Sequence, residues 1–154
     1  LMTLAKPLAG GLPIGATLML QNVADVLGPG DHGSTFAGGP VVCTAALNVL
    51  ERLSKESFLS QVRHKSDVLF TALEALKERH PKILKEARGS GLLVGVETTL
   101  DDVAPIIEGC RKRGLLVIKA GPKVLRLTPP LTITEEEIGS AVETLETVLK
   151  KIQA

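Results

Sequence analysis

Residues 4–16 read Leu4-Ala5-Lys6-Pro7-Leu8-Ala9-Gly10-Gly11-Leu12-Pro13-Ile14-Gly15-Ala16. Lys6 has apolar neighbours and precedes a glycine-rich turn, whereas lysines such as Lys55 and Lys150 lie among charged residues. A lysine that forms a Schiff base spends part of its cycle as a neutral amine, and removal from water favours that neutral form. The pattern fits a chemically used lysine in an apolar setting. A single lysine beside glycines is more often an ordinary lysine at a strand end, with its ammonium group in water.

A second segment, residues 30–40 (GDHGSTFAGGP), is a glycine-rich loop with hydroxyl side chains that leads into a helix. Backbone N–H groups, hydroxyls and the helix dipole at such an entry can bind a phosphate. The equal alternative is a surface turn in which Ser34 and Thr35 cap the backbone locally. Asp31, His32 and Ser34 have the residue types of a hydrolase triad. Sequence neighbours rarely reach triad geometry, so we discount a hydrolase.

Two further segments carry an arginine. Residues 88–95 (RGSGLLVG) match a dinucleotide-binding fingerprint poorly, because residues 92–96 resemble a strand where that fingerprint needs a helix. A tight turn between two strands is the better interpretation. Arg126 alternates with apolar residues in a strand that ends at two prolines. Its guanidinium can hold a carboxylate through two hydrogen bonds. Without further context, an edge-strand arginine that points into water is the more common case.

Hydrophobic spacing gives the order of elements along the chain. It predicts a strand over 17–20, a loop over 27–40, helices over 40–53, 58–79 and 102–113, strands over 83–88, 92–98, 115–118 and 124–127, and a last helix after the capping box Thr134–Glu137. From residue 58 this is a small α+β domain with its helices on one face of a sheet. Residues 1–55 are then the tail of a larger domain, and residues 56–154 are the small domain.

Composition excludes several classes of protein. Aromatic residues make up 2% of the chain and the net charge is +1, without a basic patch, which argues against nucleic-acid binding. No apolar run in the sequence is long enough to cross a bilayer, so a membrane partner is not expected. Cys43 and Cys110 lack metal-ligand spacing. We expect no metal site and two buried, reduced thiols in an intracellular compartment.

Together, the four segments resemble the class III aminotransferases of fold type I, which use pyridoxal 5'-phosphate. The resemblance covers essentially the whole chain, and within the class it is strongest to the acetylornithine type. It implies an α/β fold, with this chain as the C-terminal portion of such an enzyme: the tail of the large cofactor-binding domain followed by the small C-terminal domain. Because the richest motif follows the first residue almost at once, we expect a truncated chain.

The resemblance also implies a role for four residues. Lys6 binds the cofactor covalently and later moves a proton at the substrate Cα. Thr35 binds the cofactor phosphate of the neighbouring subunit of a homodimer, and Ser34 beside it touches the substrate. Arg126 binds the substrate α-carboxylate. The expected reaction is transamination of N2-acetylornithine with 2-oxoglutarate in arginine biosynthesis. Ornithine, succinylornithine, 4-aminobutyrate or an aminomutase substrate, and a non-catalytic interaction module, are the alternatives.

Other parts of such a site are expected to lie outside this chain. In the resembling family, the aspartate that holds the pyridinium nitrogen, an aromatic residue that stacks on the ring and a phosphate-binding loop all precede the lysine. A ring without that aspartate is a poor electron sink. We therefore expect the chain alone to be inactive and to bind the cofactor weakly. Resemblance to organellar forms favours a mitochondrion or chloroplast, or the cytoplasm for a bacterial source.

Overall fold

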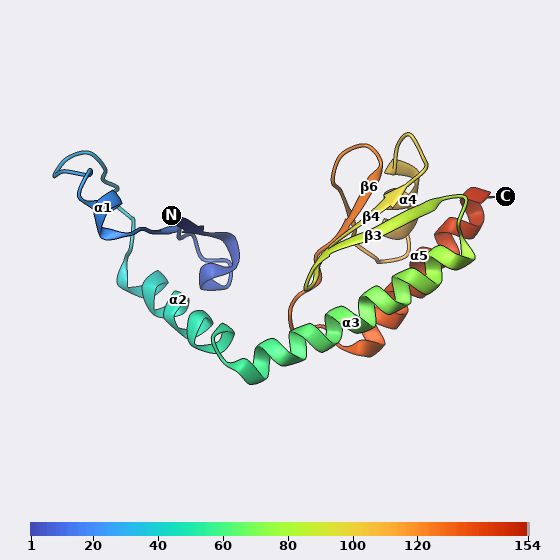
Figure 1. Ribbon diagram of the computed structural model, residues 1–154, viewed down its shortest axis with the longest axis horizontal. Helices are drawn as coiled ribbons and strands as arrows, with labels where there is room; N and C mark the ends of the chain where they lie inside the picture. Colours follow the sequence, from blue (N-terminus) through green and yellow to red (C-terminus); the bar gives the residue numbers. More distant parts are fainter. Residues whose placement is uncertain (154) are drawn as a thin grey trace. The chain divides into compact units, whose positions relative to one another are not determined.

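A computed structural model of the chain describes residues 1–153 (Figure 1). The chain divides into two compact units, Leu1–Leu59 and Ser60–Ala154. The division falls within the first turns of a long helix, whereas the domain boundary expected from the sequence falls just before that helix, after residue 55. Each unit has its own apolar cluster.

The first unit consists of two short strands, a 3-10 turn and two helices: β1 Met2–Leu4, η1 Lys6–Ala9, β2 Ala16–Leu18, α1 Gln21–Ala24 and α2 Pro40–Leu53. β1 and β2 pair antiparallel, so residues 4–16 connect the two strands of a small hairpin. The helix predicted over 40–53 is confirmed. The strand predicted over 17–20 is shorter and begins earlier. β1 and α1 were not predicted, because elements of three or four residues carry too little periodicity to detect.

A small apolar cluster joins the turn η1 to the helix α2. Leu8 and Ala9 of the turn are buried together with Ala46 of the helix. Pro40 occupies the first helical turn, where its missing N–H would have no partner in any case. Several other apolar side chains of α2 face water, and Leu47 is 58% exposed. The turn that carries Lys6 is therefore placed by three buried side chains.

The second unit follows the order helix, strand, strand, helix, strand, strand, helix that the sequence predicts. Its elements are α3 Glu56–Arg79, β3 Leu84–Ser90, β4 Leu93–Thr98, α4 Ala104–Arg111, β5 Ile118–Lys119, β6 Val124–Leu127 and α5 Glu135–Gln153. The strands form one antiparallel sheet in the order β3-β4-β6-β5. The strand predicted over 115–118 contributes only its last residue to β5. The rest of that segment runs beside the sheet without pairing to it.

Alternation along the inner strands separates the two faces of this sheet. Val94 and Val96 of β4 and Leu125 and Leu127 of β6 are buried, and they belong to the same cluster as the apolar faces of α3, α4 and α5. The residues between them point to the opposite face, where Arg126 is exposed. The helices therefore cover one face, as predicted from the sequence. We call the other the outer face of the sheet.

The three helices pack closely on the covered face. Arg79 of α3 lies 3.1 Å from Glu146 of α5, and His64 of α3 lies 3.0 Å from Glu135 at the beginning of α5. α3 and α5 therefore run side by side in the same direction (Figure 1). A Cβ added to Gly109 of α4 would lie 2.6 Å from Val148 Cγ1, so a glycine is needed where α4 crosses α5.

Local signals in the sequence set two helix boundaries of this unit. Gly114 has a φ of +80°, and its N–H bonds to the Arg111 carbonyl just beyond the end of α4, as expected for a glycine stop. The capping box before α5 is also confirmed. The Thr134 N–H donates to Glu137 Oε2 at 2.8 Å, and the Glu137 N–H donates to Thr134 Oγ1 at 3.2 Å.

One of the two cysteines differs from the expectation that both are buried. Cys110 is buried in the core, and this burial raises the pKa of its thiol to about 11. Cys43 is exposed near the beginning of α2, because the small cluster of the first unit covers only one side of that helix.

Over residues 1–153, no helix is both long and apolar enough to cross a membrane. The same residues contain no group of three metal-ligating side chains.

Candidate functional site

Lys6 begins the turn η1 in an unusual backbone conformation. Its φ is +57°, and it is the one residue other than glycine with a positive φ in the described part of the chain. This region costs an ordinary residue roughly 1–2 kcal/mol, and the following Pro7 restricts the backbone further. Backbone bonds from the Leu8 N–H to the Ala5 carbonyl (3.3 Å) and from the Gly10 N–H to the Pro7 carbonyl (3.0 Å) hold the turn. Strain of this kind is concentrated at functional sites.

The side chain of Lys6 is exposed, which differs from the apolar setting expected from the sequence. The turn buries Leu8 and Ala9 against α2 and leaves Lys6 on its open side. The apolar neighbours in the sequence are thus used for packing and do not surround the amine. Beside the lysine, a Cβ at Gly10 or Gly11 would meet nothing within 4 Å. The backbone there is open to a flat ligand.

The loop before α2 presents two hydroxyl groups. It begins with a turn in which the Gly28 N–H donates to Asp31 Oδ2 at 2.6 Å. Ser34 and Thr35 follow and are exposed. Neither hydroxyl has a hydrogen-bond partner in residues 1–153, so they do not act as local caps in this chain. The N-cap of α2 is Gly39, which offers no side-chain acceptor to the first helical N–H groups. The loop therefore leaves both hydroxyl and backbone donors available to an anion.

The structure gives no support to a hydrolase triad in this loop. The Asp31 carboxylate accepts the Gly28 N–H. His32 bonds to neither Asp31 nor Ser34 among the described residues, and all three side chains are exposed. A triad needs a base that is bonded both to the nucleophile and to an orienting carboxylate. The three side chains therefore do not have the geometry of a triad.

The glycine-rich segment at residues 88–95 is a turn between strands, as predicted. β3 and β4 form a hairpin in which Ser90 pairs with Leu93, and Gly91 has a φ of +58°. A Cβ on Gly89 would lie 2.1 Å from the Leu93 carbonyl oxygen, so the strands approach too closely there for any side chain. The glycines serve the hairpin, and no helix follows them as a dinucleotide fingerprint requires.

Arg126 is exposed on β6, on the outer face of the sheet. β6 lies between β4 and β5 and is therefore an interior strand. The alternative that Arg126 lies on an edge strand is wrong. Arg126 is paired across the strands with Gly95 on one side and Ile118 on the other. Its guanidinium has no hydrogen bond or ion pair within the described chain. The guanidinium is therefore available to a carboxylate from outside the chain. Arg126 belongs to the second unit, whereas Lys6, Ser34 and Thr35 belong to the first.

The charged side chains next to Arg126 were not identified from the sequence. Glu97 of β4 lies 2.8 Å from Lys85 Nζ and 2.5 Å from Arg88 Nη1, and Arg88 also reaches Glu86 at 3.2 Å. Hydrogen bonds from Lys85 and then Arg88 hold the pKa of Glu97 below its ordinary value. Alternation could have placed Glu86 and Arg88 on one face, but Lys85 directly precedes Glu86 and reaches Glu97 beside a register irregularity between Leu84 and Glu86. Their pairing depends on the register between strands.

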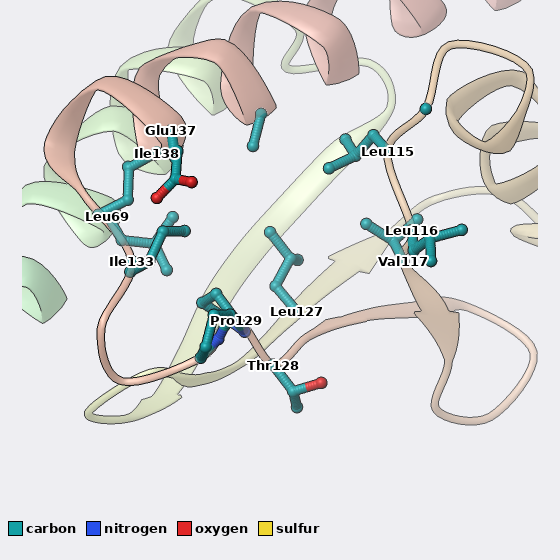
Figure 2. Close-up of a pocket in the computed structure, with 13 residues that line it drawn as sticks. Leu69, Leu115, Leu116, Val117, Leu127, Thr128, Pro129, Ile133, Glu137 and Ile138 are labelled. Atoms are coloured by element: carbon teal, nitrogen blue, oxygen red, sulfur yellow. The ribbon is translucent and has the colours of Figure 1, made fainter.

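An apolar pocket of about 510 Å³ opens at the end of β6 (Figure 2). Leu115, Leu116 and Val117 line one side. Ile133 and Ile138 line the other, at the beginning of α5. None of the four predicted site residues lines this pocket. It therefore adds no chemistry to the site residues described above.

Comparison with known proteins agrees with these motifs. The family described as Aminotransferase class-III matches residues 1–149. The acetylornithine aminotransferase of Caldanaerobacter subterraneus is 44% identical over 99% of the chain. The mitochondrial acetylornithine aminotransferase of Eremothecium gossypii is 44% identical over 100% of the chain. The chain spans 36% of the Eremothecium protein and 38% of the Caldanaerobacter protein, so it corresponds to little more than a third of each.

Solved structures show the same relationship. The acetylornithine aminotransferase of Elizabethkingia anophelis superposes with a TM-score of 0.84 at 30% identity, over 97% of this chain and 38% of that one. The ornithine aminotransferase of Toxoplasma gondii superposes with a TM-score of 0.86 at 31% identity, over 98% of this chain and 37% of that one. The mixed α/β fold is therefore the one found in part of these enzymes, and the chain belongs to the class III aminotransferase family.

Proposed function

We propose that this chain is part of an enzyme that transfers the amino group of N2-acetylornithine to 2-oxoglutarate, in arginine biosynthesis. The observation that carries the proposal is identity of 44% over the whole chain to proteins named acetylornithine aminotransferase. The proposed cofactor is pyridoxal 5'-phosphate, in keeping with the family. The products would be the semialdehyde of N-acetylglutamate and glutamate.

The residues of the first unit fit this cofactor. Its aldehyde needs a primary amine, and Lys6 offers an exposed one on a strained turn. Its phosphate needs hydrogen-bond donors, and the hydroxyl of Thr35 is exposed and free of partners within the described chain. The open backbone at Gly10 and Gly11 leaves room for a planar ring. When bound, the cofactor supplies an electron sink for the substrate Cα.

Each of the four residues then has a role that its chemistry allows. The Lys6 amine holds the cofactor and, once released, carries a proton to and from the substrate Cα. Thr35 binds the phosphate of the cofactor in the neighbouring subunit of a homodimer, and Ser34 contacts the substrate beside it. The planar fork of Arg126 fits the substrate α-carboxylate, because it can donate two parallel hydrogen bonds.

The test of this function is an assay in a protein of the relatives' full length that carries this chain. Lys6→Ala should lower transamination by at least about a thousandfold, because both the covalent link and the proton carrier are lost. Lys55→Ala, an exposed lysine between α2 and α3, is the matched control and should leave the rate unchanged. Full activity in Lys6→Ala would refute the proposal.

The 154-residue chain alone is proposed to be inactive and to bind the cofactor weakly. It spans little more than a third of the relatives, whereas the electronic tuning of this cofactor requires further protein groups around the ring. Absorbance spectra of the purified chain with added pyridoxal 5'-phosphate measure this. A strong absorbance band that disappears in Lys6→Ala and persists in Lys55→Ala would contradict the weak-binding proposal.

Another substrate within the same class is the second candidate. An ornithine aminotransferase superposes as well as an acetylornithine aminotransferase does, so the fold does not separate the two substrates. A panel of acetylornithine, ornithine, succinylornithine and 4-aminobutyrate in the full-length assay distinguishes them. We expect acetylornithine to give the highest kcat/KM, and a tenfold preference for ornithine would favour the second candidate.

A non-catalytic interaction module is the third candidate. The first unit exposes large apolar side chains, among them Phe36 at 91% and Val26 at 77%. A chain that acts only as a module should associate with itself, and size-exclusion chromatography at several concentrations measures this.

The names of two relatives bear on the location of the protein in the cell. The relatives from Eremothecium gossypii and Dictyostelium discoideum are named mitochondrial. We propose a mitochondrion or chloroplast for a eukaryotic source and the cytoplasm for a bacterial one.

A further inference from the structure

The outer face of the sheet carries a group of charged side chains that includes Arg126 of β6. β3 contributes Lys85, Glu86 and Arg88, and β4 contributes Glu97. Glu86 and Glu97 are cross-strand partners, so two carboxylates stand directly opposite each other. Like charges in that position repel unless cations compensate them. The cluster has three cations for two carboxylates, which leaves one positive charge in excess.

The ion pairs show which cation is left over. Lys85 Nζ lies 2.8 Å from Glu97 Oε1, and Arg88 Nη1 lies 2.5 Å from the other oxygen of the same carboxylate. Arg88 also reaches Glu86 at 3.2 Å. Both oxygens of Glu97 are therefore occupied by cations of β3. No acidic side chain within the described chain pairs with Arg126, so the excess charge resides on this guanidinium.

Register explains why, within residues 1–153, Glu97 is the carboxylate positioned to compete for Arg126. Gly95 stands directly opposite Arg126 and has no side chain to offer. Glu97 is two residues further along β4, opposite Val124, and is therefore the diagonal neighbour of Arg126 on the same face. Diagonal neighbours in a sheet are about 7–8 Å apart, within reach of a long side chain. A released Glu97 could thus turn from β3 to β6.

We propose that Lys85 and Arg88 are positioning residues that hold Glu97 on β3 and so keep Arg126 free for a carboxylate ligand. The inference rests on the carboxylate-binding role proposed for Arg126. The two cations do not touch that ligand. They remove its intramolecular competitor, and Gly95, which stands opposite Arg126, has no side chain that competes for the guanidinium.

The experiment follows the side-chain Nε–Hε signal of Arg126 by NMR in the 154-residue chain, with glutarate as the carboxylate probe. The test variant is Lys85→Met/Arg88→Gln, which releases Glu97. Its control is Arg111→Gln/Lys112→Met, which removes the same charges from the pairs with Glu108 on α4. Adding Glu97→Gln to the test variant removes the competitor again. Dispersion of the backbone amide signals reports whether each variant is folded.

In the test variant, the Arg126 signal should shift before any glutarate is added, because Glu97 now pairs with the guanidinium. Glutarate should then bind roughly two- to fivefold more weakly, since an exposed ion pair competes with it. Adding Glu97→Gln should restore the original Arg126 signal and the original affinity for glutarate. The control variant should change neither the signal nor the affinity. An Arg126 signal that is unchanged by the loss of Lys85 and Arg88 would overturn the inference. If Arg126 never responds to glutarate but does shift in the test variant, the positioning role stands and the proposed ligand role of Arg126 fails.

Discussion

The two units of the chain differ in how much of their own fold they support. The first unit, Leu1–Leu59, buries three apolar residues in its cluster, whereas nineteen are buried in the cluster of the second unit, Ser60–Ala154. Among the residues that the structure describes, eleven of the fifteen exposed large apolar side chains belong to the first unit. Yet the first unit carries three of the four proposed site residues: Lys6, Ser34 and Thr35. The proposed site residues and the core packing are thus concentrated in different parts of the chain.

This difference indicates what each unit requires. Ordering a residue costs roughly 1–2 kcal/mol of backbone entropy, which a cluster of three small or medium side chains cannot offset for 59 residues. The first unit therefore depends on further apolar surface for its stability, and its exposed side chains are the surface that would be covered. The second unit has a continuous core between its sheet and three helices. Substitutions should affect the two units very unequally.

The largest expected effect comes from the core of the second unit. Leu73 of α3 is 1% exposed, and Leu73→Ala should lower the free energy of unfolding by about 2–5 kcal/mol through lost burial and a cavity. Leu47→Ala removes the same atoms from α2, where Leu47 is 58% exposed, and should cost less than about 0.5 kcal/mol. Urea denaturation followed by circular dichroism measures both. Equal losses would contradict the proposed contrast between the units.

Glycines should show the same contrast at a smaller scale. Gly89→Ala would bring a Cβ to 2.1 Å from the Leu93 carbonyl oxygen, and we expect a loss of about 1–3 kcal/mol as the hairpin shifts to accommodate it. In the first unit, a Cβ on Gly33 would meet nothing within 4 Å, so Gly33→Ala should be nearly neutral. Thermal unfolding of both variants tests this. A neutral Gly89→Ala would show that the hairpin tolerates a wider strand separation.

The sequence predicted the second unit more completely than the first because the two differ in the length of their elements. α3 and α5 are long enough for their apolar periodicity to be unambiguous, and the Thr134–Glu137 box marks where α5 begins. β1 and α1 have only three and four residues, so no period could reveal them. The extent of β5 was overestimated, because pairing with β6 ends while the apolar run continues toward Leu115.

For the site, the sequence identified residue types but could not supply their surroundings. It predicted Lys6 as a chemically used residue, but not its positive φ or its exposure. Arg126 was placed on a strand correctly, whereas the interior position of that strand follows from the sheet order. The pairing of Glu97 with Lys85 and Arg88 depends on register and on an irregularity in β3. Such long-range geometry is not encoded in the spacing of neighbouring residues.

A smaller effect is expected at the capping box of α5, where it also depends on pH. Thr134→Ala should cost about 1 kcal/mol at neutral pH by removing a cap. Hydrogen bonds from the Thr134 N–H and hydroxyl hold the pKa of Glu137 below its ordinary value of 4.5. A lowered folded-state pKa stabilises the fold above the unfolded pKa, and this contribution is lost as pH falls through the folded value. Denaturation curves should therefore show the wild type and Glu137→Gln converging in acid, and a constant difference down to low pH would contradict this.

The smallest predicted effect is the relief of strain at Lys6. Lys6→Gly should stabilise the turn by about 0.5–1 kcal/mol relative to Lys6→Ala, because glycine adopts a φ of +57° without a Cβ clash. Hydrogen exchange of the bonded Leu8 and Gly10 amides measures this locally, and amides of the second unit should not change. Equal exchange in the two variants would mean that the turn is unstrained. Slower exchange in Lys6→Gly would show that the first unit keeps a lysine at this position at a cost in stability. The second unit has no such cost at Arg126, which lies in an ordinary strand.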